Sequence, residues 1–211
     1  MNTYRPSIEN MPHRIAALPI SDNGYPIPYF VAKIDGKHDF RVIDPLKIHR
    51  CVRDKLCWIC GDKLGKFKAF SAGPLLTVTR LSGEPPSHTD CAEFAARTCP
   101  FMLLPRSKMH TAEIDGTTAI PAMLTHNPGV TVIWVTDSYE VIRGGHSVAF
   151  LAGEPISVHW YAEGQHATRD HAERGIALSL MHAVETSKGN PDTQRMLMES
   201  AADIDAYLPL E

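Results

Sequence analysis

The sequence has no apolar run near the roughly 20 residues that a membrane-spanning helix needs. Its first residues, MNTYRPSIENMPHR, lack the apolar stretch of a secretory signal peptide. The first absence argues against an integral membrane protein and the second against secretion. We therefore expect a soluble protein of the cytoplasm, with no membrane partner.

Cysteine is also scarce, and its five copies form an odd number. An odd number does not suit a framework of disulfides, and in a reducing compartment clustered cysteines more often bind a metal. No internal repeat or low-complexity tract is visible in the 211 residues. This length is enough for a proper hydrophobic core.

The expected elements mix strands and helices without strand–helix–strand alternation, which indicates an α+β fold. After an extended arm over the first ~28 residues, a hairpin over 29–43 turns at Asp35-Gly36. Asp44-Pro45 then opens a short helix. Two strands are expected on either side of Gly73-Pro74. We expect one α+β domain over 1–211, with a zinc-binding module over 55–100 inside it.

The next helix covers 88–98, with Ser87 as its cap, Asp90 completing a capping box and Pro100 ending it. Residues 102–128 have no clear period and are expected to be a connecting segment. Strands are then predicted over 129–136, 147–153 and 155–162, followed by a helix over about 168–187. Asn190-Pro191 opens a final helix.

The stretch KLCWICGDKLG contains half of a metal site. Cys57 and Cys60 have the C-x-x-C spacing of a zinc knuckle, and Gly61 allows the positive φ of its tight turn. Backbone N–H groups in such turns point at the thiolates. Two ligands do not complete a tetrahedral structural site, so two more are required.

The stretch PPSHTDCAEF supplies the other pair, His88 and Cys91. In the first turn of the expected helix, residues three apart lie on one face. The helix N-terminus also favours the thiolate form of cysteine, which is the metal ligand. A knuckle, a hairpin and ligands from the start of a helix form the layout of a treble-clef zinc finger. We predict a structural Zn²⁺ site of Cys57, Cys60, His88 and Cys91.

Other roles for the cysteines have less support. Cys99 lies about 12 Å along a helix from Cys91, too far to share one zinc. Cys51 is expected to pack as a small apolar residue. A redox C-x-x-C pair would need a thioredoxin-like βαβ pattern, which is missing here. The HNH nucleases are also treble clefs, but residues 61–87 contain no histidine to act as their general base.

The net charge of −3 conceals an uneven distribution. Residues 47–80 carry eight Lys and Arg against two acids, whereas residues 137–211 carry twelve acids against five bases. The basic block is either a surface for an anionic partner or a solvated face balanced by the acidic half. The candidate nucleic-acid-binding residues are Lys63, Lys66, Lys68 and Arg80.

Three blocks of the sequence carry a resemblance to a known family: LCWICGDKLG, EPPSHTDCAEFAARTCPF and VHWYAEGQHATRDHAERGIAL. They are similar to an uncharacterised family of bacteriophages, prophages and bacterial genomes, which shares LCW-x-CG, EPP-x-H-x-x-CA-x-x-A-x-x-CPF and W-x-EG-x-x-ATR motifs. The lead-in GYPIPYFVAKIDGKHDFRV is similar too, whereas FSAGPLLTVTRL departs from the FVIGPM type of segment. The resemblance implies a phage-related origin, a bacterial host cytoplasm and the same metal pairing, but no reaction.

A second concentration of polar chemistry lies near the C-terminus, where five histidines fall within 37 residues: His146, His159, His166, His171 and His182. His166 and His171 could form a metal or acid–base site, with Arg169 holding an anionic ligand. The alternative is that these histidines are scattered over surface and loops.

Two functions follow from these observations. The first is a non-enzymatic, phage-type zinc-binding protein that binds nucleic acid or a phage or host protein. The second is a hydrolase or nucleotide-processing enzyme with its site at the C-terminal histidines. The sequence leaves open whether the protein is an enzyme, and convergence of His166, Arg169 and His171 on one cleft would favour the second.

Overall fold

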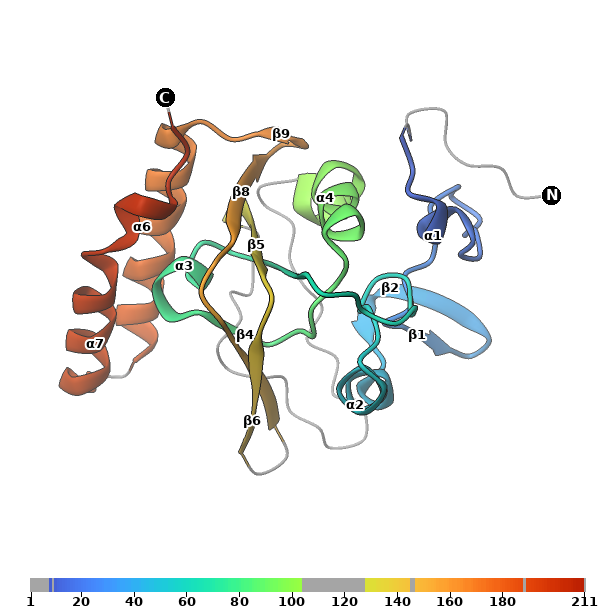
Figure 1. Ribbon diagram of the computed structural model, residues 1–211, viewed down its shortest axis with the longest axis horizontal. Coiled ribbons are helices and arrows are strands. Elements are labelled where there is room, and N and C mark those ends of the chain that lie inside the picture. Colours follow the sequence, from blue (N-terminus) through green and yellow to red (C-terminus); the bar gives the residue numbers. More distant parts are fainter. Residues whose placement is uncertain (1–7, 9, 104–127, 145–146, 188, 211) are drawn as a thin grey trace.

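The computed structural model describes residues 8, 10–103, 128–144, 147–187 and 189–210 (Figure 1). The described residues combine helices with three antiparallel sheets, which confirms the α+β prediction. Most of the expected connecting segment, 104–127, lies outside them. Among the described residues, no helix has both the length and the apolar character needed to cross a membrane.

The helices are α1 (His13–Ala16), α2 (Pro45–Asp54), α3 (Leu76–Thr79), α4 (Thr89–Thr98), α5 (Pro100–Leu103), α6 (Arg169–Thr186), α7 (Pro191–Ala201) and the 3₁₀ turn η1 (Ile204–Tyr207). The strands are β1 (Val31–Ile34), β2 (Lys37–Ile43), β3 (Lys68–Ala72), β4 (Leu81–Ser82), β5 (Thr131–Thr136), β6 (Tyr139–Gly144), β7 (Ser147–Ala152), β8 (Ser157–Ala162) and β9 (Gln165–His166). The sheets have the strand orders β1-β2, β3-β5-β8-β9 and β4-β7-β6.

The four-stranded sheet is the centre of the molecule, with α4 on one face and the C-terminal helices beyond the other (Figure 1). Every residue of β5 is buried, because alternate side chains enter two different cores. Val132 and Trp134 join Ile176 of α6 in the main core. Ile133 and Val135 pack instead with Ala92 and Ala96 of α4. The sheet is therefore covered on both faces.

Local signals correctly predict several helix starts. The carboxylate of Asp44 accepts a hydrogen bond from the backbone N–H of Leu46 at 3.0 Å. Asn190 caps α7 through the N–H groups of Asp192 and Thr193, both at 3.1 Å. The hairpin turn also forms as expected, with positive φ at Asp35 and Gly36. These features depend on neighbours in the chain, so sequence patterns capture them.

Other expectations are wrong. Leu76–Thr79 is a turn of helix instead of a strand, and β3 and β4 pair with β5 and β7 instead of with each other. His88, not Ser87, is the N-cap of α4, and no capping box forms there. The stretch after β5 also contains a strand, β6, that sequence reading missed.

The N-terminal segment is more than an extended arm. Residues 13–16 form a helical turn whose Ile15 is only 1% exposed. Ile15 packs with Cys57, Cys60, Cys91 and other apolar neighbours in a cluster distinct from the main core, which we call the cysteine cluster; its other buried members are Ile59 and Phe94. The N-terminal segment therefore covers the candidate metal site.

Candidate metal centre

The structure brings together the four residues that the sequence assigns to one metal site. The sulfur atoms of Cys57, Cys60 and Cys91 and a ring nitrogen of His88 all lie within 4.8 Å of one another, and all four residues are buried. His88 Nδ1 is 3.4 Å from Cys60 Sγ and 3.9 Å from Cys91 Sγ. A tetrahedral zinc with ordinary Zn–S and Zn–N bonds would place such atoms about 3.6 Å apart. The spacing therefore fits one tetrahedral ion.

A short bridged turn shapes the knuckle. The carbonyl of Cys57 accepts the N–H of Gly61 at 2.9 Å, and the N–H of Cys57 reaches the carbonyl of Asp62 at 2.7 Å. Gly61 has φ of +80°, and a Cβ there would lie 2.8 Å from Cδ2 of Tyr29. Glycine is thus required both by the backbone and by the neighbouring ring.

Backbone donors already face the sulfur of Cys57. The N–H groups of Cys60 and His88 lie 3.5 and 3.4 Å from Cys57 Sγ. His88 occupies the N-cap position of α4 and Cys91 lies in its first turn, so the helix dipole also favours negative charge at this place. The site is therefore arranged for thiolates.

The carbonyl of Lys63 orients the histidine ring. It lies 3.0 Å from His88 Nε2, and because a carbonyl can only accept, Nε2 carries the proton. Nδ1 then presents its lone pair to the sulfur atoms. A backbone carbonyl behind a ligand histidine is the usual support of a metal-bound imidazole. Neither this carbonyl nor the ring of Tyr29 has a sequence signature.

The three thiols cannot all ionise by themselves. Hydrogen bonds from the thiols of Cys60 and Cys91 lower the pKa of Cys57 well below its ordinary range. The hydrogen bond to Cys57 in turn raises the pKa of Cys60 to about 12, and the pKa of Cys91 rises for the same reason. One thiolate is therefore stable alone, whereas three need a cation among them. The donor set fits a divalent metal ion.

The remaining cysteines lie outside this group of ligands. Cys51 is buried in α2, and burial raises the pKa of its thiol to about 12. Burial also raises the pKa of Cys99, which follows α4. Their exclusion from the site rests on position, because neither thiol belongs to the group of four potential ligand atoms.

The candidate nucleic-acid-binding residues differ in their availability. Lys63 and Lys66 are exposed, and the ammonium of Lys66 lies 5.5 Å from the ring centre of Phe67. Lys68, in contrast, donates to the carbonyls of Lys66 and Asp137, at 2.9 and 2.7 Å. Arg80 pairs with Glu154. Two of the four cations are thus engaged within the protein.

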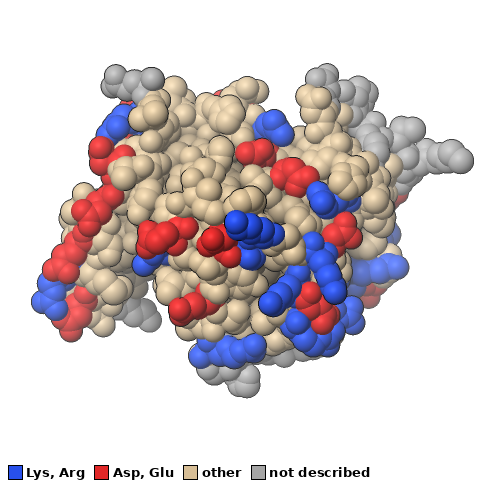
Figure 2. Space-filling model, viewed as in Figure 1, with Lys and Arg blue, Asp and Glu red and all other residues tan. Residues whose placement is uncertain are grey.

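Exposed cations of α2 adjoin Lys63. The hydrogen bond from Arg53 is the largest cause that lowers the pKa of Asp54. The positive charges of Arg53, Lys63 and Arg50 lower it further. Lys55 follows α2, and its carbonyl bonds the N–H of Leu64 at 2.8 Å. Lys and Arg gather on this side of the molecule in Figure 2, whereas Asp and Glu dominate the side of α7. We call Arg50, Arg53, Lys55, Lys63 and Lys66 the basic surface.

The residues of the C-terminal candidate site each have partners within the protein. The guanidinium of Arg169 binds Glu173 at 2.8 Å and also Asp205, so two carboxylates of the protein already neutralise its charge. His171 Nδ1 lies 2.9 Å from the hydroxyl of Thr168 and belongs to the capping box of α6. The ring of His166 packs on Tyr161. Among the described residues, these histidines join no group of potential metal ligands, and His146 lies outside that part of the chain.

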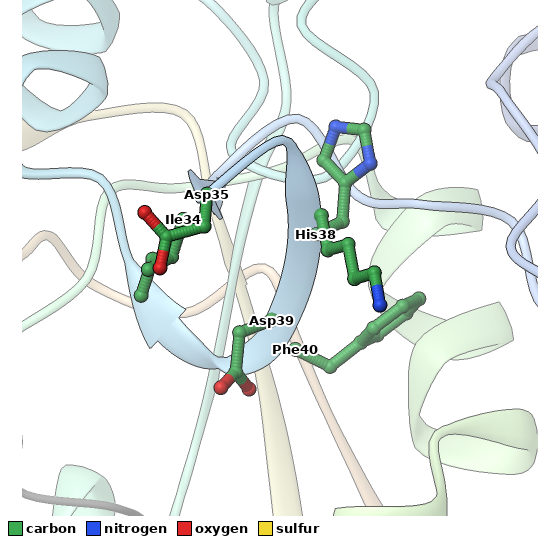
Figure 3. Close-up of a pocket in the computed structure, with 6 residues that line it drawn as sticks. Ile34, Asp35, His38, Asp39 and Phe40 are labelled. Carbon is green, nitrogen blue, oxygen red and sulfur yellow. The ribbon is translucent and has the colours of Figure 1, made fainter.

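A surface hollow in the β1–β2 hairpin is lined by Ile34, Asp35, Lys37, His38, Asp39 and Phe40. Figure 3 shows that the side chains of Asp35, His38 and Asp39 point in different directions from the twisted hairpin. Acid–base chemistry needs such groups within hydrogen-bond reach of one substrate. Figure 3 shows no such convergence among the side chains that it labels.

Comparison with known proteins does not identify the chain: no family model, no curated protein and no solved structure matches it.

Proposed function

We propose that the protein is a structural zinc protein whose metal holds a basic binding surface in place. The observation that carries this proposal is the buried group of three sulfurs and one oriented imidazole nitrogen, spaced as a tetrahedron requires. Three thiolates and an imidazole are soft and borderline ligands, which suit Zn²⁺ better than Mg²⁺ or Ca²⁺. With four protein ligands no position remains open for water, so the role is structural.

The first test is metal content. Protein purified without chelators should carry one zinc per chain, measured by elemental mass spectrometry. Cys91→Ser should lose the metal and unfold at a much lower urea concentration, because a structural zinc contributes folding free energy directly. Cys99→Ser is the matched control and should keep the metal. Loss of zinc in Cys99→Ser but not in His88→Ala would contradict the assignment.

The zinc module supports a treble-clef-like interpretation in part. A knuckle and a helix start supply the ligands, as that layout requires. The segment between them differs, because β3 and β4 pair with other strands. A phage or prophage origin, with function in a bacterial cytoplasm, rests on the motif resemblance alone.

We infer that the basic surface binds nucleic acid. Its five cations lie before and after the zinc knuckle in the sequence, and one of them, Arg53, is paired with Asp54. The metal site itself would carry only about −1 from three thiolates and a divalent ion. The exposed ring of Phe67, 48% accessible, lies beside Lys66 and offers a face for a base to stack on. Contacts of this kind are dominated by phosphates and tolerate any sequence.

The second test is a gel-shift titration at several salt concentrations. Affinity should fall steeply with salt, with a log–log slope of roughly −0.9 per neutralised phosphate on duplex DNA. Lys63→Glu with Lys66→Glu should weaken binding and flatten the slope without loss of zinc. Arg195→Glu, on α7, is the control and should bind as the natural protein does. If neither duplex nor single-stranded DNA or RNA is retarded at low salt, the partner is a phage or host protein instead.

A further inference from the structure

A serine, a histidine and a glutamate form a line on the α4 face of the central sheet. Ser157 and His159 are two residues apart on β8, so their side chains leave the same face of the strand. The hydroxyl oxygen of Ser157 lies 2.8 Å from His159 Nε2. On the other side of the ring, His159 Nδ1 lies 3.9 Å from Glu93 Oε1 of α4. The order of atoms is hydroxyl, Nε2, Nδ1, carboxylate.

This order determines where the protons lie. A carboxylate near Nδ1 favours the tautomer with its proton on Nδ1, which leaves a lone pair on Nε2. Nε2 can then accept the hydroxyl proton of Ser157. A distance of 2.8 Å is within the range of a nucleophile and its base. The distance of 3.9 Å between His159 Nδ1 and Glu93 Oε1 is that of an ion pair. Such contacts in catalytic sites commonly shorten only when substrate binds.

The line is accessible to small molecules. The side chain of His159 is 34% exposed and that of Glu93 is 26% exposed. Burial raises the pKa of the neighbouring Tyr161, Glu93 raises it further, and Arg97 lowers it. Glu93 and Arg97 thus both lie near the phenol of Tyr161. None of these residues belongs to the metal centre or the basic surface.

We propose that Ser157, His159 and Glu93 form a nucleophilic site for small carboxylic esters. Ser157 Oγ attacks the ester carbonyl while its proton passes to His159 Nε2, and the Oγ–C bond forms. The C–O bond to the leaving alkoxide breaks, and the alkoxide takes the proton from Nε2. Water then attacks the acyl-serine with the same histidine as base, which releases the acid and restores the serine. Glu93 orients the ring and stabilises its positive charge.

A purely structural role is the alternative, because a hydroxyl–imidazole hydrogen bond also fastens neighbouring side chains of a strand. The two roles differ in chemistry. A structural hydroxyl does not react with electrophiles faster than other serines, whereas an activated one does. A fluorophosphonate probe distinguishes them, since Oγ displaces fluoride from phosphorus and His159 takes the proton.

The experiment labels the full-length, zinc-loaded protein with an alkyl fluorophosphonate and measures the mass of the intact chain and of its peptides. One adduct on Ser157 is expected. Hydrolysis of p-nitrophenyl acetate should depend on the same serine and histidine. His159→Gln should slow labelling by about 10²-fold or more, and Glu93→Gln by a smaller factor.

Ser157→Ala removes the adduct, and Ser187→Ala is its matched control. The hydroxyl of Ser187 donates to the carbonyl of Val184 at 2.7 Å and should remain unreactive. Zinc content and circular dichroism of each variant show that it is folded. An unlabelled natural protein, an adduct that persists in Ser157→Ala, or a rate unchanged in His159→Gln would each overturn the proposal. The result does not depend on nucleic-acid binding, so the two proposals fail separately.

Discussion

At the scale of single residues, Gly61 lets the metal knuckle pack closely against the ring of Tyr29. Gly61→Ala should place a methyl group against the ring of Tyr29, whereas Gly36→Ala meets nothing within 4 Å at a similar φ of +81°. Both variants have the strain of a left-handed residue, about 1 kcal/mol. Gly61→Ala should lose about 1–3 kcal/mol more, because the ring must move. Urea unfolding of the zinc-loaded proteins measures the difference, and equal losses would contradict a role for Tyr29.

Glu84 makes stability depend on pH. Burial raises the pKa of its carboxyl from 4.5 to about 7, and the indole N–H of Trp58 lowers it only in part. Between these values the folded chain holds a proton that the unfolded chain has lost. The contribution of protonated Glu84 to the free energy of unfolding is therefore fully present below pH 4.5. It is lost as pH rises to about 7, by about 3 kcal/mol at most.

Glu84→Gln should remove this dependence. The variant should be more stable than the natural protein by about 3 kcal/mol at pH 8 and by only about 1 kcal/mol at pH 5.5, because glutamine does not ionise. Free energies of unfolding from urea titrations at the two pH values check this result, with Glu199→Gln on the exposed side of α7 as control. A variant less stable than the natural protein at pH 8 would show that the charged carboxylate has a stabilising partner.

At the scale of elements, sequence patterns predict features that depend on near neighbours. The caps Asp44, Thr168 and Asn190 all accept backbone hydrogen bonds within their own helices. The pairing of Cys57 and Cys60 with His88 and Cys91 is local in the same way, since each pair lies within one turn of chain. The chain between the two pairs brings them together, and its predicted strand pairing is wrong.

Elements that depend on distant contacts escape such patterns. Thr77, Val78 and Thr79 favour strands, yet the hydroxyls of Thr77 and Thr79 donate to the carbonyls of Pro74 and Leu75 and support a helical turn. β6 is mostly exposed and is held by its pairing with β7. Ser157 and His159 show an ordinary alternating spacing, and Glu93 joins them from 66 residues earlier in the sequence than His159. No window of sequence contains that contact.

At the scale of the whole molecule, two sets of buried residues share α4. Cys91 and Phe94 point into the cysteine cluster, and Ala92 and Ala96 point at the central sheet. The cysteine cluster is small and includes the sulfurs of three cysteines, so the proposed zinc would contribute directly to its stability. The second continues into a sheet whose middle strand is buried throughout. The two halves should therefore respond differently to loss of the metal.

Removal of zinc should open the cysteine cluster before the central sheet. Without the cation, two of the three crowded thiolates must take up protons, and the hydrogen bonds of the knuckle lose their support. We expect hydrogen exchange to accelerate in peptides over 10–18 and 55–65 after treatment with a strong chelator, while peptides over 131–136 stay protected. Peptides of α4 should show intermediate protection, because one face of the helix still packs on the sheet. Added Zn²⁺ should restore the original pattern, whereas equal acceleration in β5 would mean that the metal stabilises the entire fold as one cooperative unit.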